Sequence, residues 1–246
     1  MIRRAIVMVL SMILLATSTA PAFAIESFMM FEAANPDGPA GAPAPCRLNA
    51  NRDGNCANYK WYNACAGYIW IFNGWVAGEG VGVRFGGPSQ PCVNSSTRVK
   101  RGIYYFRNIV PSYGQTVDLF LDADCDGDGC PEGNLGAALN VDPGLRWNCI
   151  DYGACIPCDG VILRQLHDGG VAPTFATDGP FKTGCDPAHM PTHSYYYGID
   201  GSTCVPWVGV PATDPDDFFM WLIVDSPGCV ESSVNSSWGA VKGLYE

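Results

Sequence analysis

The feature that most constrains this chain is its set of cysteines. The sequence contains 12 of them, and the first stands at position 46. An even number of cysteines behind an export signal predicts a disulfide framework, which restricts the unfolded chain. Up to six disulfides are therefore expected. The pairs we expect are Cys125–Cys130, across one short glycine-rich loop, and then Cys65–Cys92 and Cys185–Cys204, across neighbouring strands.

The N-terminal segment is typical of a secretory signal peptide. Arg3 and Arg4 precede an apolar run over residues 5–16, and Ala22-Phe23-Ala24 forms a small-residue cleavage pattern. The apolar run is shorter than the roughly 20 residues that span a bilayer, which argues against a membrane anchor. We therefore expect residues 1–24 to be removed and the protein to be secreted, periplasmic or held at the cell surface.

The charge of the chain excludes one class of partner. The formal charge is −10 at pH 7. It becomes more negative once the signal peptide, with its two arginines and no acid, is removed. Nucleic-acid binding requires a basic surface, so we expect no nucleic-acid partner. An acidic surface suits solubility outside the cell and the binding of hard cations. We also expect a monomer without a membrane span after signal removal.

The pattern of the mature chain predicts an all-β fold. Residues 25–45 are expected to form an N-terminal extension, with an edge strand over 25–32 and a Pro/Gly/Ala-rich linker over 33–45. Residues 46–246 are expected to form a single β-sandwich domain, jelly-roll-like and stapled by disulfides. Residues 145–160 and 168–193 are expected to be long irregular loops. The expected strands are 67–72, 80–85, 101–106, 116–122, 160–165, 194–199 and 218–224.

One acidic segment has the pattern of a calcium loop. Asp122, Asp124, Asp126 and Asp128 alternate with other residues, and Gly127 permits a tight turn. Calcium takes six to eight hard oxygens, which such spacing can bring together. The segment resembles the first half of an EF-hand or dockerin loop. It departs from that family because a glycine replaces the twelfth-position glutamate. The alternative is an acidic hairpin tip without an ion, because Asp and Gly are ordinary turn residues.

Aromatic residues suggest a second kind of site. Trp61, Tyr62 and Trp75 flank a candidate strand, so we expect their rings to be exposed and able to stack on a sugar. The alternative is that these rings pack in the core.

Other motifs are weaker. His189 and His193 have a zinc-ligand spacing but lie in a proline-rich loop, so ordinary loop histidines are favoured. Cys155 and Cys158 form a C-x-x-C that we interpret as structural. The chain contains no nucleophile elbow, no H-E-x-x-H and no phosphate loop.

Two stretches carry a resemblance to known proteins. Residues 61–70 (WYNACAGYIW) and 236–245 (SWGAVKGLY with its preceding serine) resemble stretches of exported, cysteine-rich β proteins of environmental bacteria. The resemblance implies export and no particular activity; the tail is either a sorting tag or a closing element of the domain. The leading hypothesis is a secreted or surface-associated, non-enzymatic binding or structural module, stabilised by Ca²⁺, with a glycan or cell-surface partner. The alternative is a secreted carbohydrate-active hydrolase or glycan-binding module.

Overall fold

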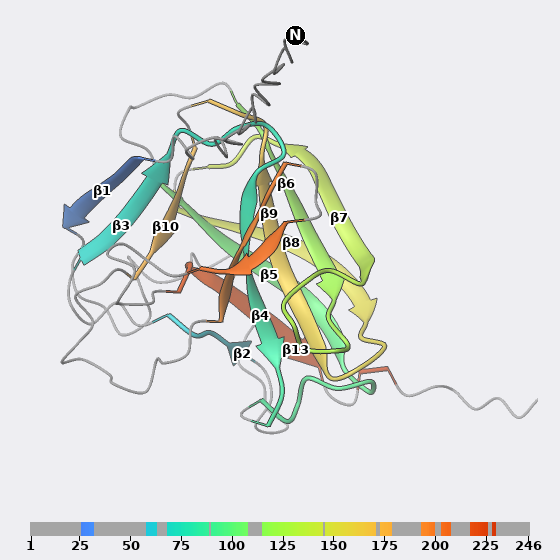
Figure 1. Cartoon of the computed structure of the whole chain (residues 1–246). Helices are drawn as coiled ribbons and strands as arrows, with labels where there is room; N and C mark the ends of the chain where they lie inside the picture. The colour runs from blue at the N-terminus through green and yellow to red at the C-terminus, as the bar shows by residue number, and fades with distance from the viewer. Residues whose placement is uncertain are drawn as a thin grey trace, which may run out of the picture.

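The computed structural model describes residues 26–31, 58–62, 68–88, 90–107, 115–144, 146–170, 173–178, 193–199, 203–207, 217–225 and 228–229. These residues form two antiparallel sheets and no helix. The seven-stranded sheet has the order β1-β3-β10-β5-β13-β2, with β8 paired to the other side of β5. The six-stranded sheet has the order β12-β11-β4-β9-β6-β7. The fold is therefore the expected disulfide-stapled β-sandwich (Figure 1).

The strands of the seven-stranded sheet are β1 (Glu26–Phe31), β2 (Asn58–Tyr59), β3 (Tyr68–Asn73), β5 (Arg98–Arg107), β8 (Arg146–Cys155), β10 (Thr174–Thr177) and β13 (Met220–Asp225). The strands of the six-stranded sheet are β4 (Gly80–Gly86), β6 (Val117–Ala123), β7 (Gly133–Val141), β9 (Gly160–His167), β11 (Ser194–Tyr197) and β12 (Cys204–Pro206).

The main core lies between the two sheets. In β6, Val117, Leu119 and Leu121 are fully buried and share one face, as their alternation predicts. Other strands contribute their inward side chains to the same cluster: Phe72, Val81, Val83, Phe85, Tyr104, Phe106, Val161, Leu163, Phe175, Met220 and Leu222. Burial of this apolar surface is the main force that holds the sandwich together.

A second apolar cluster lies on the other face of the seven-stranded sheet. Its buried members are Tyr62, Ile69, Ile71, Ile103, Tyr105, Trp147, Ala176, Phe219 and Ile223. The β13 segment shows why both faces are covered: Met220 and Leu222 point into the main core, whereas Phe219 and Ile223 belong to the second cluster. A strand that is apolar on both faces requires cover on both faces.

Each of the seven expected strands is present. The expected edge strand over 25–32 is β1, which pairs with β3 at one end of the sheet. The sandwich therefore includes residues before the expected domain boundary at residue 46. The expected loop over 145–160 is wrong in its first part, because it contains β8, and the expected loop over 168–193 contains the short strand β10. In β8, Trp147 and Cys149 contact the second cluster while Ile150, Tyr152 and Ala154 contact the main core.

Three disulfides have both of their cysteines among the described residues: Cys125–Cys158, Cys130–Cys204 and Cys155–Cys229. Cys92 and Cys149 are also disulfide-bonded. Disulfides at so many positions indicate that the protein folds in an oxidising, extracytoplasmic compartment.

The expected pairs Cys125–Cys130 and Cys185–Cys204 are wrong. Cys125 and Cys130 flank one loop, but their sulfurs bind to different partners, in the turn before β9 and in β12. Proximity in sequence therefore did not decide the pairing. The expected partner of Cys92, Cys65, lies outside the described residues, as do the signal segment 1–24, the linker 33–45 and the tail 236–245. Among the described residues no helix is long and apolar enough to cross a membrane.

Candidate functional site at the acidic loop

The acidic segment begins at the end of β6 and continues into the loop that leads to β7. Asp122 is the one of its four acids that lies inside the strand, and its side chain is only 1% exposed. Arg164 on β9 donates from Nε to Asp122 Oδ2 over 2.7 Å, and Asn134 donates from Nδ2 to Asp122 Oδ1 over 3.0 Å. The protein itself therefore neutralises and satisfies this carboxylate.

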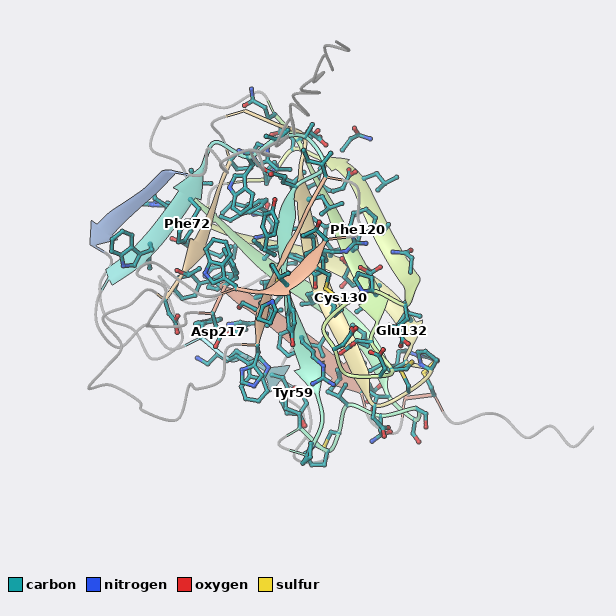
Figure 2. The ribbon with its side chains drawn as sticks, viewed as in Figure 1. Tyr59, Phe72, Phe120, Cys130, Glu132 and Asp217 are labelled. Atoms are coloured by element: carbon teal, nitrogen blue, oxygen red, sulfur yellow. A yellow bond between two sulfur atoms is a disulfide. The ribbon has the colours of Figure 1, made fainter. Side chains whose placement is uncertain are left out.

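Asp124 is held in a similar way. Its side chain is fully buried, and Arg84 on β4 donates from Nε to Asp124 Oδ2. The backbone N–H of Gly129 donates to Asp124 Oδ1 over 3.1 Å. A Cβ placed on Gly127 would lie 2.9 Å from Arg84 Nη2, so the loop passes directly against the guanidinium. Arg84 is thus the cation around which the acidic loop closes. Figure 2 labels two residues of this part of the chain, Cys130 and Glu132.

The two remaining acids of the segment are exposed. Asp126 Oδ1 accepts the backbone N–H of Asp128 over 3.1 Å, and Asp128 Oδ1 accepts that of Cys130 over 2.7 Å. One carboxylate oxygen from each of Asp124, Asp126 and Asp128 lies within 4.8 Å of the other two. The structure therefore brings together three of the four expected calcium ligands, while Asp122 is directed to Arg164.

Two tyrosines lie under the loop. Tyr197 on β11 donates from its hydroxyl to the carbonyl of Gly129 over 2.8 Å. Burial raises the pKa of this hydroxyl well above its ordinary value, so it remains a neutral donor. Gly129 has a φ of +83°, and a Cβ at this position would lie 2.1 Å from the ring of Tyr195. Only glycine allows the loop to approach the sheet so closely.

The three expected stacking rings lie in different places. The expectation that they are exposed is wrong for Tyr62 and Trp75, which are each 2% exposed. Tyr62 packs edge-on to Phe219 at 4.5 Å in the second cluster, and Trp75 packs against Phe175 at 4.7 Å in the main core. A ring that flanks a strand can still be covered, because this sheet is buried on both faces.

Trp61 is half-buried and has one covered face. Its indole Nε1 donates to the carbonyl of Arg84 over 2.8 Å. The imidazole of His193 stacks parallel to its ring at 3.5 Å, with an interplanar angle of 2°. His193 Nδ1 lies 3.9 Å from Oδ2 of the fully buried Asp217, which Figure 2 labels. The His193 face of Trp61 is therefore closed to a sugar.

The remaining motifs are placed as follows. The C-x-x-C does not form a redox pair, because Cys155 is bonded to Cys229 and Cys158 to Cys125. The H-x3-H pair is described only at His193, because His189 lies outside the described residues. The functional residues that sequence reasoning missed are Arg84 and Arg164. Their alternation with buried neighbours places both on the outward face, but nothing in the sequence pairs them with particular carboxylates.

Comparison of the chain with protein families, with curated proteins and with solved structures finds no match. The carboxylate oxygens of the loop are of the kind that bind hard cations, and the half-buried Arg84 and two disulfides hold the loop in place.

Proposed function

We propose that the protein is an exported, non-enzymatic binding or structural module that acts outside the cytoplasm. The observation that supports this proposal is the placement of two disulfides at one end of the six-stranded sheet. Cys125–Cys158 ties the acidic loop to the turn between β8 and β9, and Cys130–Cys204 ties the same loop to β12. Loops fixed in this way lose little conformational entropy when they meet a partner, which favours binding.

The export part of the proposal has a direct test. The full chain is expressed with its N-terminal segment in a bacterial host, and the cell fractions are analysed by mass spectrometry and thiol titration. The expected product lies outside the cytoplasm, begins after Ala24 and has no reactive thiol. An unprocessed cytoplasmic product with free thiols would contradict export.

We also propose that Ca²⁺ stabilises the acidic loop. The proximity of the Asp124, Asp126 and Asp128 carboxylates supports this, since three like charges within 4.8 Å repel one another unless a cation is shared. Arg84 already neutralises Asp124, so the ion would serve chiefly the two exposed acids.

Thermal unfolding tests the calcium proposal. The oxidised protein is unfolded with Ca²⁺ and with a chelator, and a higher melting temperature is expected with Ca²⁺. A ligand at a hundred times its Kd adds about 2.7 kcal/mol to the free energy of unfolding. The double variant Asp126→Asn/Asp128→Asn should lose the difference, whereas Asp142→Asn, an exposed acid beyond β7, should keep it. Equal curves for the unaltered protein at millimolar Ca²⁺ would exclude the site.

A further inference from the structure

The part of the chain that the structure describes contains both residues of four Asp-Gly sequences, at 126–127, 128–129, 159–160 and 168–169. A chain readily modifies itself at this dipeptide, because a glycine has no Cβ to keep its backbone nitrogen away from the carboxyl carbon of the preceding aspartate. The nitrogen must lose its proton and turn toward that carbon. The surroundings of each glycine N–H therefore decide which of the four sequences can react.

Two of the four glycine nitrogens are held by hydrogen bonds. Gly129 is buried and donates its backbone N–H to Asp124 Oδ1 over 3.1 Å. Gly169 donates its backbone N–H to His167 Nδ1 over 2.8 Å. Each of these bonds would have to break before the nitrogen could attack, so the sequences at 128–129 and 168–169 are protected.

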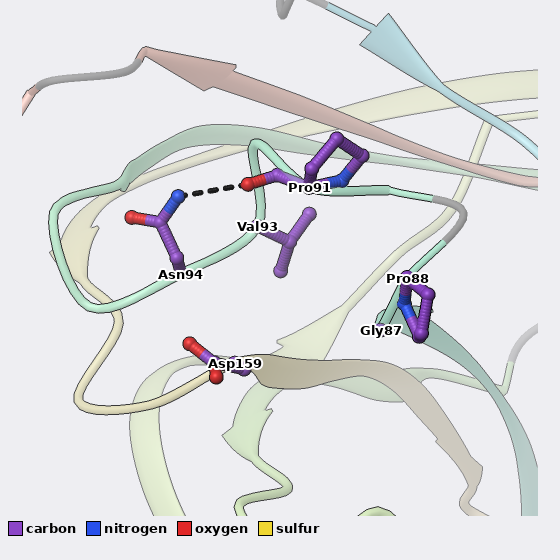
Figure 3. A pocket seen from close by; sticks show the side chains of 6 residues that line it. All are labelled: Gly87, Pro88, Pro91, Val93, Asn94 and Asp159. Carbon is purple, nitrogen blue, oxygen red and sulfur yellow. Dashed lines mark hydrogen bonds between the residues drawn. The ribbon is translucent and has the colours of Figure 1, made fainter.

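A third glycine nitrogen is held by the sheet. Asp159 is exposed in the turn before β9, where Figure 3 labels it. Gly160 is buried, pairs with Gly86 of β4, and accepts the backbone N–H of Asp124 at its carbonyl over 3.1 Å. A Cβ on Gly160 would lie 2.2 Å from the carbonyl oxygen of Asp124. The peptide between Asp159 and Gly160 therefore has no room to turn toward the side chain.

The fourth sequence, Asp126-Gly127, has none of these restraints. Asp126 is exposed and Gly127 is half-buried in the acidic loop, outside any strand. Among the described residues, no hydrogen bond is formed by the N–H of Gly127, although those of Asp128, Gly129 and Cys130 are all bonded. The nitrogen of Gly127 is thus the one in this loop that is available for attack.

Two neighbours of this peptide favour the attack. Asp126 Oδ1 accepts the backbone N–H of Asp128 over 3.1 Å, which turns the Asp126 carboxyl back along the chain, over the Gly127 peptide. The guanidinium of Arg84 lies against Gly127, since a Cβ at this glycine would stand 2.9 Å from Arg84 Nη2. A fixed positive charge stabilises the negative charge that the attacking nitrogen carries.

We propose that Asp126-Gly127 is a self-modification site, at which Asp126 converts to isoaspartate. The nitrogen of Gly127 forms a bond to Cγ of Asp126, and the amide proton leaves with a carboxyl oxygen and its proton as one water, which gives a five-membered succinimide. A second water then opens the ring. Opening at Cγ restores aspartate, whereas opening at the former main-chain carbonyl leaves the chain running through Cβ and Cγ. One water is lost and one is gained, so no other reactant is needed.

The product changes the acidic loop. Isoaspartate adds one carbon to the main chain between two anchored positions, because Cys125 is bonded to Cys158 and Cys130 to Cys204. It also places the free carboxylate of residue 126 directly on Cα, away from the carboxylates of Asp124 and Asp128. The modification should therefore end the convergence of the three acids. This consequence for Ca²⁺ rests on the proposed cation site, whereas the isomerisation itself does not.

The test ages the full oxidised chain at mildly acidic pH in water labelled with heavy oxygen, with a chelator present so that no bound cation shields the loop. Mass spectrometry with electron-transfer fragmentation locates isoaspartate and the label. Both are expected at residue 126 and not at 128, 159 or 168, whereas the reduced chain unfolded in urea should react at all four. Asp126→Glu should lose the product, because its longer side chain must close a six-membered ring. The matched control Asp128→Glu should keep it.

Each outcome decides one step. Equal labelling at 126, 128, 159 and 168 in the folded chain would overturn the argument from the glycine N–H groups, and no label at 126 would overturn the inference entirely. Unfolding curves of both variants that match the unaltered protein show that a lost product is not lost folding. The aged protein should also lose the rise in melting temperature with Ca²⁺. If fresh protein shows no such rise while label appears at 126, the calcium proposal fails and the isomerisation stands.

Discussion

The buried pair of Arg84 and Asp124 allows a quantitative prediction. In the variant Arg84→Met, the fully buried Asp124 carboxylate loses its charged partner and keeps the backbone N–H of Gly129. Removing one member of a buried ion pair costs about 3–5 kcal/mol, because the other charge is left without compensation. The Arg84 side chain is 20% exposed and one hydrogen bond to Asp124 remains, so we expect the low end, about 3 kcal/mol.

The assay is urea unfolding of the oxidised protein, with the free energy of unfolding taken by linear extrapolation. Lys100→Met is the matched control, because the side chains of its pair with Asp225 are 45% and 49% exposed. Exposed pairs contribute about 0.2–1 kcal/mol, so this variant should lose far less. The double variant Arg84→Met/Asp124→Asn should recover part of the loss, because no charge remains buried. Equal losses for Arg84→Met and Lys100→Met would refute the reasoning.

Two further predictions concern Gly129 in the acidic loop and the tyrosine pair Tyr104 and Tyr152. Gly129→Ala should lower the free energy of unfolding more than Gly153→Ala does. Both positions have a positive φ, which costs a residue with a Cβ roughly 1–2 kcal/mol. Only at Gly129 would the added Cβ also collide with a ring, that of Tyr195. Urea unfolding of the two variants measures the difference, and equal losses would show that the loop can move away from the sheet. Burial raises the pKa of Tyr104 and of Tyr152, whose hydroxyls share a hydrogen bond of 2.6 Å. A raised folded-state pKa contributes stability that is complete below the unfolded pKa of about 10 and is lost as the pH rises above it. Unfolding by urea at increasing alkaline pH should therefore show falling stability, with a shallower slope for Tyr152→Phe; an unchanged slope would contradict the account.

The sandwich was predictable from the sequence because its strands carry strong local patterns. In β6, alternation alone separates Leu119 and Leu121 from Asp118 and Phe120, and the structure keeps this division. The β8 strand was missed because Gly153, Asp151 and two cysteines give it the composition of a loop. Its strand character depends on pairing with β5, including the contact of Arg101 with Asp151, and such a long-range contact leaves no local signal.

The candidate site was predictable only in part. The spacing of Asp124, Asp126 and Asp128 correctly anticipates that their carboxylates converge. The spacing says nothing of Arg84, which stands 40 residues earlier and reaches the loop because β4 and β6 both pair with β9. The burial of Tyr62 was equally hidden, since it depends on a second cluster on the far side of a sheet. Contacts between layers decide these features, and a one-dimensional pattern does not record them.

The connectivity of the cysteines has a consequence for how the protein is made. Cys125 and Cys130 emerge five residues apart, yet their partners follow 33 and 74 residues later. An oxidant acting on the growing chain can join these two neighbours before either native partner has emerged, and such a bond must be exchanged before the native pairs can form. We therefore expect the host compartment to supply a disulfide isomerase as well as an oxidant. The yield of native protein should then depend on the isomerase activity that rearranges non-native disulfides of this chain.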